Sequence, residues 1–129
     1  MRRFREEGLS LAVAEIRWLL GRVRESGSRL AIVFAPFRES VLPAEGWWAD
    51  ELRWKSQELS SAVEVAARAE DVPFLDATLA LRARAGRSPE SLFYEGADTH
   101  PTPLGYRALA EEVGRWLVDR GLVGASGAS

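Results

Sequence analysis

Two residues in the C-terminal half of the chain, Asp98 and His100, have the types and the spacing for acid–base chemistry. A histidine ring normally titrates near neutral pH, so it can take up and release a proton during a reaction. A carboxylate beside the ring fixes its tautomer and stabilises the imidazolium that forms. The pair therefore predicts the general-base half of a nucleophilic triad. The alternatives are a solvated loop histidine and an Asx-turn aspartate that shapes the loop.

Ser40 is a candidate nucleophile because it follows an apolar run that predicts a strand. Ligands of open α/β sheets gather beyond the carboxyl ends of the strands. However, the segment 37–40 lacks the glycines of a tight strand-to-helix elbow, so an ordinary turn serine is the alternative. Arg38 is a candidate substrate-lining residue in the same loop as Glu39, although loop charges of this kind are more commonly solvated.

Three tryptophans bracket the start of a predicted helix. Aromatic clusters can stack on sugar rings or cap an acyl pocket, which makes Trp47 and Trp48 candidate substrate-lining residues. At helical spacing such side chains more often pack a helix against its neighbours, and we expect Trp47, Trp48 and Trp54 to do so.

The composition excludes several classes of site. The chain has 129 residues, 47% of them hydrophobic, and a net charge of −2 without a basic stripe, so a globular domain with no nucleic-acid partner is expected. The absence of cysteine excludes disulfides, thiolate catalysis and cysteine metal sites. With one histidine, a zinc site would have to recruit carboxylates, so we predict no metal.

The chain shows no membrane-spanning pattern. The first residues, MRRF, resemble the start of a signal peptide, but Glu6, Glu7, Glu15 and Arg17 interrupt the stretch that a signal peptide would keep apolar. We therefore expect a helix there, and the cellular compartment stays open.

The elements that must position Asp98 and His100 alternate between helix and strand. Apolar residues at helical spacing predict helices over 9–24 and 49–70, and Gly27 is expected to end the first of them. The apolar run 30–35 predicts a parallel strand covered by helices on both faces, and 72–75 predicts a short strand at a sheet edge.

The remaining elements follow from capping signals. Asp76 is expected to cap a helical turn over 77–85, and Thr102-Pro103 to start the last helix, which Gly121 ends. The small, polar residues 124–129 are expected to form a flexible tail after a single domain over 1–123.

The predicted order is that of an α/β fold with a doubly wound sheet. Two strands are few, since a typical sheet has about five. The strand 30–35 would then keep an open edge, which favours aggregation unless it is covered. Either the chain is part of a larger domain, or self-association or a partner chain covers this strand.

The segment Asp98-Thr-His100-Pro101, followed by Gly105 and a helix rich in Ala and Glu, resembles the C-terminal block of SGNH/GDSL hydrolases. The resemblance covers about residues 9–120 and implies catalytic roles for Asp98 and His100. It also implies a partial three-layer α/β/α, flavodoxin-like fold, of which this chain would be the C-terminal half. No cofactor is implied.

Two departures from the family pattern matter. The Asp-x-His spacing is shorter than the usual Asp-x-x-His and is similar to the branch resembling alginate O-acetyltransferases. The chain also contains neither a Gly-Asp-Ser nor a Gly-x-Asn-Asp segment. We therefore expect the nucleophile to lie N-terminal to Met1 in the intact protein, and the chain alone to be inactive.

These features leave three hypotheses for function. The first is a segment of a serine esterase or lipase that acts on a small-molecule or carbohydrate ester. The second is an O-acyltransferase acting on carbohydrate. The third is a non-catalytic remnant or interaction module that pairs the strand 30–35 with another chain.

Overall fold

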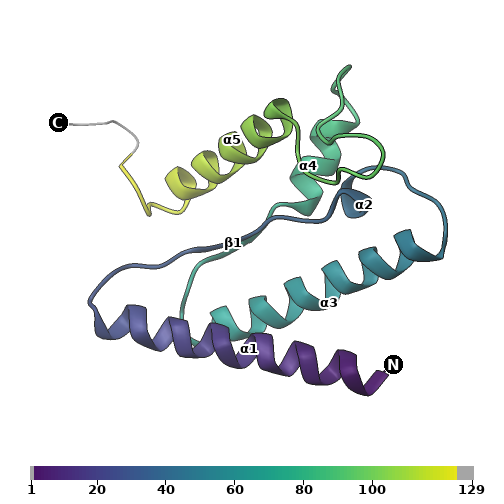
Figure 1. The fold of residues 1–129 in the computed structure, drawn as a ribbon. Helices are drawn as coiled ribbons and strands as arrows, with labels where there is room; N and C mark the ends of the chain where they lie inside the picture. The colour runs from purple at the N-terminus through teal and green to yellow at the C-terminus, as the bar shows by residue number, and fades with distance from the viewer. Residues whose placement is uncertain (1, 125–129) are drawn as a thin grey trace. The chain divides into compact units, whose positions relative to one another are not determined.

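The computed structural model describes residues 2–124, with side chains from Glu6 onward. Its elements are α1 (Arg2–Glu25), β1 (Ile32–Phe34), α2 (Arg38–Val41), α3 (Trp47–Ala69), β2 (Phe74–Asp76), α4 (Thr78–Ala85) and α5 (Pro103–Asp119) (Figure 1). The helix-rich chain with a two-stranded parallel sheet is the expected partial α/β fold. Of the expected flexible tail, residues 125–129 lie outside the described residues.

The two strands pair in parallel, but both are shorter than predicted. The Ile32 N–H donates to the Pro73 carbonyl at 2.9 Å, and the Ala77 N–H donates to the Phe34 carbonyl at 3.1 Å. All three β1 residues are half-buried, and the prediction that helices cover this strand on both faces stays a prediction. Among the described residues, β1 and β2 have only each other as neighbours, so the sheet keeps open edges.

The internal contacts divide the chain into two compact units. The first unit comprises the chain up to Ile32 together with Trp54–Phe74, and the second comprises Val33–Arg53 together with the chain from Leu75 onward. The single domain expected over 1–123 stays a prediction.

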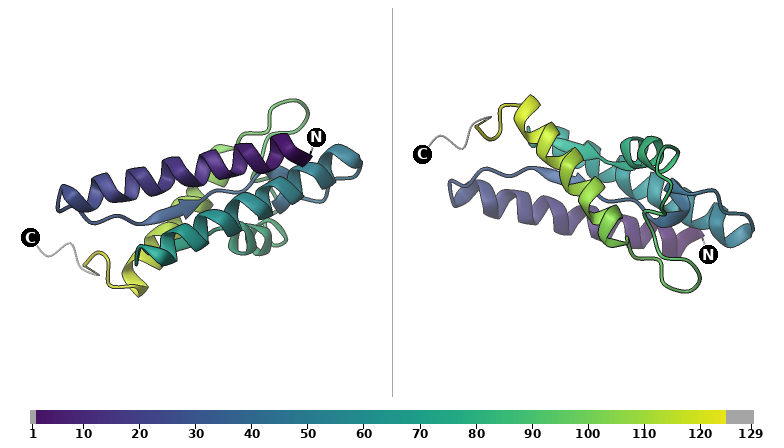
Figure 2. Two further views of the ribbon diagram at one scale, coloured as in Figure 1. Left: turned by 90° about the horizontal axis from the view of Figure 1, so that it is seen from below. Right: turned by 90° about the horizontal axis from the view of Figure 1, so that it is seen from above.

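In the first unit, α1 lies alongside the C-terminal part of α3 in all three ribbon views (Figures 1 and 2). Arg24, near the end of α1, bonds Glu70 through a carboxylate contact and a carbonyl contact, each of 2.8 Å. Gly27 follows α1 with a φ of +74°, a conformation that glycine adopts without a steric penalty. The predicted exit from this helix is thus confirmed.

The second unit contains the main apolar cluster, which packs α2, α4 and α5 around the segment 92–93. Its buried members are Val41, Ala77, Leu81, Leu92, Phe93 and Ala108. The Asp76 carboxylate accepts from the Thr78 N–H at 2.8 Å, a contact two residues ahead that is typical of an Asx turn. The N-cap residue of α4 is Ala77, so the prediction that Asp76 caps this helix is wrong by one residue.

The helix α2 was not predicted, since Arg38 and Glu39 were expected to lie in a loop. Its last carbonyls receive donors from distant side chains. Arg53 donates to the Glu39 carbonyl at 2.9 Å, and Arg82 donates to the Ser40 carbonyl at 2.7 Å. These tertiary bonds satisfy acceptors that a one-turn helix cannot pair internally.

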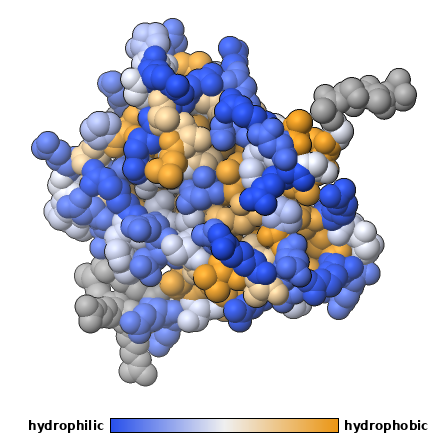
Figure 3. All heavy atoms as spheres, turned by 180° about the vertical axis from the view of Figure 1, so that it is seen from behind, coloured by the Kyte–Doolittle hydropathy of each residue, from blue (hydrophilic) through white to orange (hydrophobic). Residues whose placement is uncertain are grey.

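Large apolar side chains also remain exposed. Figure 3 shows apolar residues in orange among hydrophilic residues in blue on one face. Leu11, Trp18 and Leu79 are 62%, 68% and 73% exposed. No helix among the described residues is long and apolar enough to cross a membrane.

Candidate active site

A closed loop of the second unit carries Asp98 and His100. At its base, Phe93 and Pro101 form an antiparallel bridge, and the Thr102 N–H donates to the Leu92 carbonyl at 2.9 Å. Leu92 and Phe93 are buried at 1% and 3% exposure, within the apolar cluster. The core therefore fixes the base of the loop, from which the tip emerges.

The start of α5 anchors the C-terminal side of the loop. The Thr102 hydroxyl accepts from the Gly105 N–H at 3.2 Å and donates to the Ser91 carbonyl at 3.0 Å. Pro103 is the first helical residue, where its missing N–H costs no hydrogen bond. The predicted Thr-Pro helix start is confirmed, and it places His100 three residues before α5.

The tip of the loop brings Asp98 and His100 together through one carboxylate oxygen. Asp98 Oδ1 lies 2.9 Å from the backbone nitrogen of His100 and 2.8 Å from its ring Nδ1. The first contact is an Asx turn, which requires a partner two residues ahead. The Asx-turn and ring-orienting interpretations of Asp98 are therefore compatible in one geometry.

These contacts also set the electrostatics of the pair. The backbone N–H of His100, and then its ring, hydrogen-bond the Asp98 carboxylate and hold its pKa below the ordinary value of 3.8. A carboxylate accepts at Oδ1, so Nδ1 carries the proton and the neutral ring presents Nε2 as an acceptor. The side chains of His100 and Asp98 are 78% and 55% exposed, so a reactant can approach the ring.

Arg38 and Glu39 are not solvated loop charges, and that expectation is wrong. Their side chains are only 14% and 1% exposed, and they form an ion pair of 3.0 Å. The Arg38 guanidinium donates to backbone carbonyls of the loop that carries Asp98. Arg38 therefore contacts the candidate site through the backbone of the loop and not through its side chains.

Ser40 is not brought to the Asp98–His100 pair by any hydrogen bond that the structure describes. It lies in α2, where its hydroxyl is buried and has no hydrogen-bond partner among the described residues. A nucleophile must reach its substrate and lie beside a base. The geometry does not support this role for Ser40.

The tryptophans were expected to pack α3 against its neighbours, and this prediction is wrong for Trp47. Trp47 is 81% exposed, and Trp48 and Trp54 are 41% and 43% exposed. Trp47 and Trp48 belong to the same unit as His100, whereas Trp54 belongs to the other unit. The Trp47 side chain is thus mostly exposed, whereas the Trp48 indole lies against Gly46.

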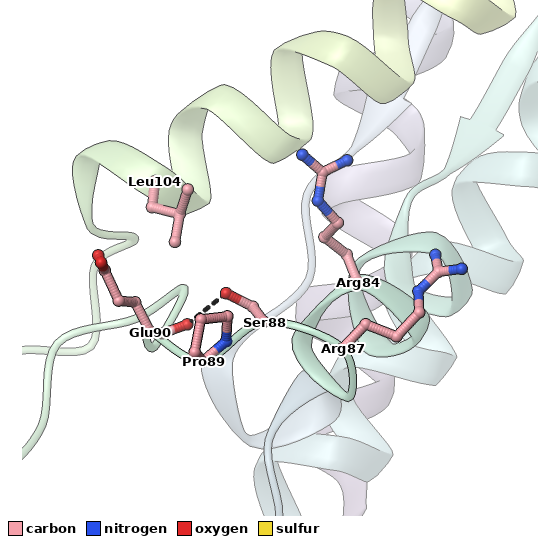
Figure 4. A pocket seen from close by; sticks show the side chains of 6 residues that line it. All are labelled: Arg84, Arg87, Ser88, Pro89, Glu90 and Leu104. Atoms are coloured by element: carbon pink, nitrogen blue, oxygen red, sulfur yellow. Dashed lines mark hydrogen bonds between the residues drawn. The ribbon is translucent and has the colours of Figure 1, made fainter.

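Two pockets in the second unit lie outside the Asp98–His100 pair. One, of about 660 Å³, lies beside α2 and is lined by Glu39, Ser40, Val41, Leu42, Pro43, Arg53, Arg82, Ala85 and Gly86. The other, of about 510 Å³, is shown in Figure 4 and is lined by Arg84, Arg87, Ser88, Pro89, Glu90 and Leu104.

The pocket of Figure 4 has polar groups that already bind within the protein. Arg84 pairs with Glu111 at 2.7 Å, and the Ser88 hydroxyl donates to the Glu90 carbonyl at 2.7 Å. Leu104 points toward Pro89 across the pocket (Figure 4). The residues that line this pocket do not include Asp98 or His100, so the pocket is separate from the candidate acid–base pair.

Arg53 and Arg82 were missed as supports of the site. Both reach carbonyls of α2, and Arg82 lies 42 residues from its partner Ser40. A contact over this sequence separation leaves no local periodicity or capping signal. No pattern in the sequence would have identified it.

The family assignment follows from comparison with known proteins. The sequence pattern of the GDSL-like Lipase/Acylhydrolase family matches residues 3–108, which include both strands, the closed loop and the Asp98–His100 pair. Neither a curated protein nor a solved structure matches the chain significantly. Since the match covers most of its length, this chain belongs to the GDSL-like Lipase/Acylhydrolase family.

Proposed function

We propose that the chain supplies the acid–base pair of a serine-dependent ester hydrolase. The observation that carries the proposal is the double contact of Asp98 Oδ1 with the backbone and the ring of His100. Membership of a lipase and acylhydrolase family supports a hydrolase-type function. We further propose that the nucleophilic serine lies outside these 129 residues, because Ser40 Oγ is buried and the sequence has no Gly-Asp-Ser segment.

The proposed reaction uses both ring nitrogens of His100, with Nε2 transferring the proton and Nδ1 held by Asp98. His100 Nε2 takes the proton from the serine hydroxyl while the serine oxygen bonds to the ester carbonyl carbon. The protonated ring then donates to the departing alcohol as the ester C–O bond breaks. Water hydrolyses the acyl-serine by the same steps, and Asp98 stabilises the imidazolium each time without being protonated itself. The substrate would be a small-molecule or carbohydrate ester.

A fluorophosphonate probe tests the location of the nucleophile. The folded chain, verified by circular dichroism, is treated with the probe, and any modified residue is located by mass spectrometry, with Ser40→Ala and His100→Ala in parallel. We expect no labelled serine. A label that disappears in His100→Ala would place the nucleophile within the chain and overturn that part of the proposal.

Diethyl pyrocarbonate tests the acid–base pair separately. His100 is the only histidine in the sequence, so acylation of imidazole reports this ring alone. We expect Asp98→Asn to slow the acylation, since the oriented ring loses its carboxylate partner. The variant Asp119→Asn, at the end of α5, is the control. Equal acylation rates in the wild-type chain and Asp98→Asn would refute the orienting role of Asp98.

O-acyl transfer to carbohydrate is the second candidate function. It is favoured by the exposed indoles of Trp47 and Trp48, since aromatic faces stack on sugar rings. The Asp-x-His spacing also motivates it. The completed domain, supplied with an acetyl donor and a sugar acceptor, would lose donor faster with acceptor present and yield an acetylated sugar. Donor loss that ignores the acceptor would leave hydrolysis as the reaction.

A non-catalytic interaction module is the third candidate. Its support is the two-stranded sheet, whose edges have no further strand among the described residues. Pairing of β1 with a second copy or a partner chain would complete the backbone hydrogen bonds. Light scattering after size-exclusion chromatography measures the mass in solution, and a stable monomer would count against self-association.

A further inference from the structure

One guanidinium nitrogen holds three carbonyls of the loop that carries the proposed acid–base pair. Arg38 Nη1 lies 2.9 Å from the Tyr94 oxygen, 3.0 Å from the Gly96 oxygen and 3.1 Å from the Asp98 oxygen. The third acceptor belongs to the residue whose carboxylate contacts the His100 ring. These carbonyls converge on Arg38 because the chain turns at Gly96, which has a φ of +76°.

The other edge of the same guanidinium is fixed by Glu39. Nε and Nη2 of Arg38 lie 3.1 Å and 3.0 Å from Glu39 Oε1. The Glu39 side chain is 1% exposed, so its charge depends on Arg38 for compensation. A planar guanidinium can bind a carboxylate on one edge and carbonyls on another, whereas a lysine ammonium is a single point of charge.

The short helix α2, which carries Arg38, is itself held in place by tertiary contacts. Arg38 is the first residue of α2, which follows β1 through Pro36, a buried residue. Arg53 and Arg82 bind the carbonyls of Glu39 and Ser40 at the other end of α2. The exposed loop tip is thus tied to the carboxyl end of a strand through a half-buried side chain.

We propose that Arg38 is a positioning residue for the ester-cleaving reaction, holding the segment 94–98 in the conformation in which the Asp98 carboxylate faces the His100 ring. The proposal rests on the proposed function for its chemical meaning. The hydrogen bonds of Arg38 reach the loop backbone and not the His100 ring, and its charge also favours the ionised Asp98 carboxylate. The role of Arg38 as a substrate-lining residue stays a prediction beside this one.

The test compares the wild-type chain with the double variant Arg38→Gln/Glu39→Gln by NMR. Removing both charges avoids leaving the Glu39 carboxylate buried and unpaired, which would destabilise the whole fold. We expect exchange of the Tyr94 and His100 amides, which donate to the His100 carbonyl and the Asp98 carboxylate, to accelerate roughly tenfold to hundredfold. The reason is that the closed loop loses its charged donor to three carbonyls. The Asp98 pKa should also rise toward 3.8, because both the Arg38 charge and the His100 contacts lower it in the wild-type chain. Amide exchange is therefore the readout that reports positioning of the loop.

Arg84→Gln is the matched control, since it removes an arginine of the same unit from an ion pair with Glu111. The exchange of residues 94–100 should be unchanged in this control. Equal exchange and equal Asp98 titration in the double variant and the control would overturn the proposal. If the double variant unfolds, rotation of the Arg38 guanidinium is measured in the wild-type chain. Slow rotation supports the Arg38 clamp, that is, the contacts of Arg38 with the carbonyls of Tyr94, Gly96 and Asp98, and fast rotation refutes it.

These readouts need no turnover, so the two proposals fail in different ways. One outcome is that Arg38 orders the loop as expected, while His100 is acylated equally fast in the wild-type chain and in Asp98→Asn. This outcome would refute the proposed function and leave the Arg38 contacts as purely structural ones. The opposite outcome is that acylation of His100 by diethyl pyrocarbonate slows in Asp98→Asn but not in Arg38→Gln/Glu39→Gln. This outcome would keep the proposed function and refute positioning by Arg38.

Discussion

The α-carbon of Gly105 packs directly against the backbone carbonyl of Leu92. A Cβ added at position 105 would overlap the Leu92 oxygen and lie 2.9 Å from its carbonyl carbon and 3.0 Å from the Cβ of Pro101. The same Leu92 oxygen accepts from the Thr102 N–H at the base of the closed loop. The first turn of α5 thus lies against the loop at a distance that only glycine permits.

Gly105→Ala is expected to destabilise the protein by about 1–3 kcal/mol, because the added methyl must displace backbone atoms. Gly114→Ala is the control in the same helix, since a Cβ there would meet nothing within 4 Å. The control should gain about 1 kcal/mol from helix propensity. Urea unfolding measures both, and similar changes of the same sign would contradict the close packing at Gly105.

Thr102→Ala is expected to cost about 1 kcal/mol of stability through loss of the α5 cap. The hydroxyl bonds Gly105 N and Ser91 O, and Thr102→Ser retains both contacts in principle. Thermal unfolding should therefore rank wild type and Thr102→Ser above Thr102→Ala. A serine variant as unstable as the alanine variant would show that the threonine methyl, and not the hydroxyl, matters.

Leu92→Ala is expected to cost about 2–5 kcal/mol, because it removes a core side chain that is 1% exposed. Leu79→Ala, on α4, is the control, since Leu79 is 73% exposed and its loss should change stability by about 0.5 kcal/mol or less. Denaturant midpoints measure the difference. Equal costs would mean that the apolar cluster around Leu92 does not stabilise the second unit.

The Asp98–His100 contact predicts a dependence of stability on pH. Folding lowers the pKa of Asp98 below 3.8, so the folded state binds this proton less tightly than the unfolded state. The contribution is therefore fully present above about pH 4, near the unfolded value, and is lost as pH falls through the lower folded value. Carbon-detected NMR titration of the Asp98 carboxyl measures the folded midpoint.

The variant His100→Gln separates the two contacts of Asp98. The backbone N–H of residue 100, the largest cause of the shift, remains, whereas the ring contact is lost. The Asp98 midpoint should rise but stay below 3.8. A midpoint unchanged from the wild-type chain would show that the ring does not stabilise the carboxylate.

Local signals predicted much of this structure. Thr102-Pro103 marked the start of α5, and Gly27 and Gly121 marked helix ends, where both adopt positive φ. The two-residue spacing of Asp98 and His100 predicted both the Asx turn and the orienting contact. Each of these patterns is complete within a few residues, so the sequence itself contains the cause.

The remainder depends on partners that are distant in the sequence. Arg38 binds carbonyls 56 to 60 residues away, and a charged residue after a strand carries no sign of such partners. The one-turn α2 has no helical periodicity to detect and is held by Arg53 and Arg82. The predicted burial of Trp47 was wrong because apolar spacing on a helix leads to burial only where another element covers that face.

The Arg38 clamp also bears on how this site could diverge. Its three acceptors on the loop are backbone carbonyls, which every amino acid possesses, whereas the loop side chains from Tyr94 to His100 are exposed. Substitutions at Glu95, Ala97 and Thr99 can therefore change the exposed side chains of the loop without removing its backbone contacts with Arg38. The surface chemistry of the loop can thereby vary independently of the Asp98–His100 contact. For the proposed hydrolase, a library at these three positions would therefore sample substrate preference while the pair keeps its geometry.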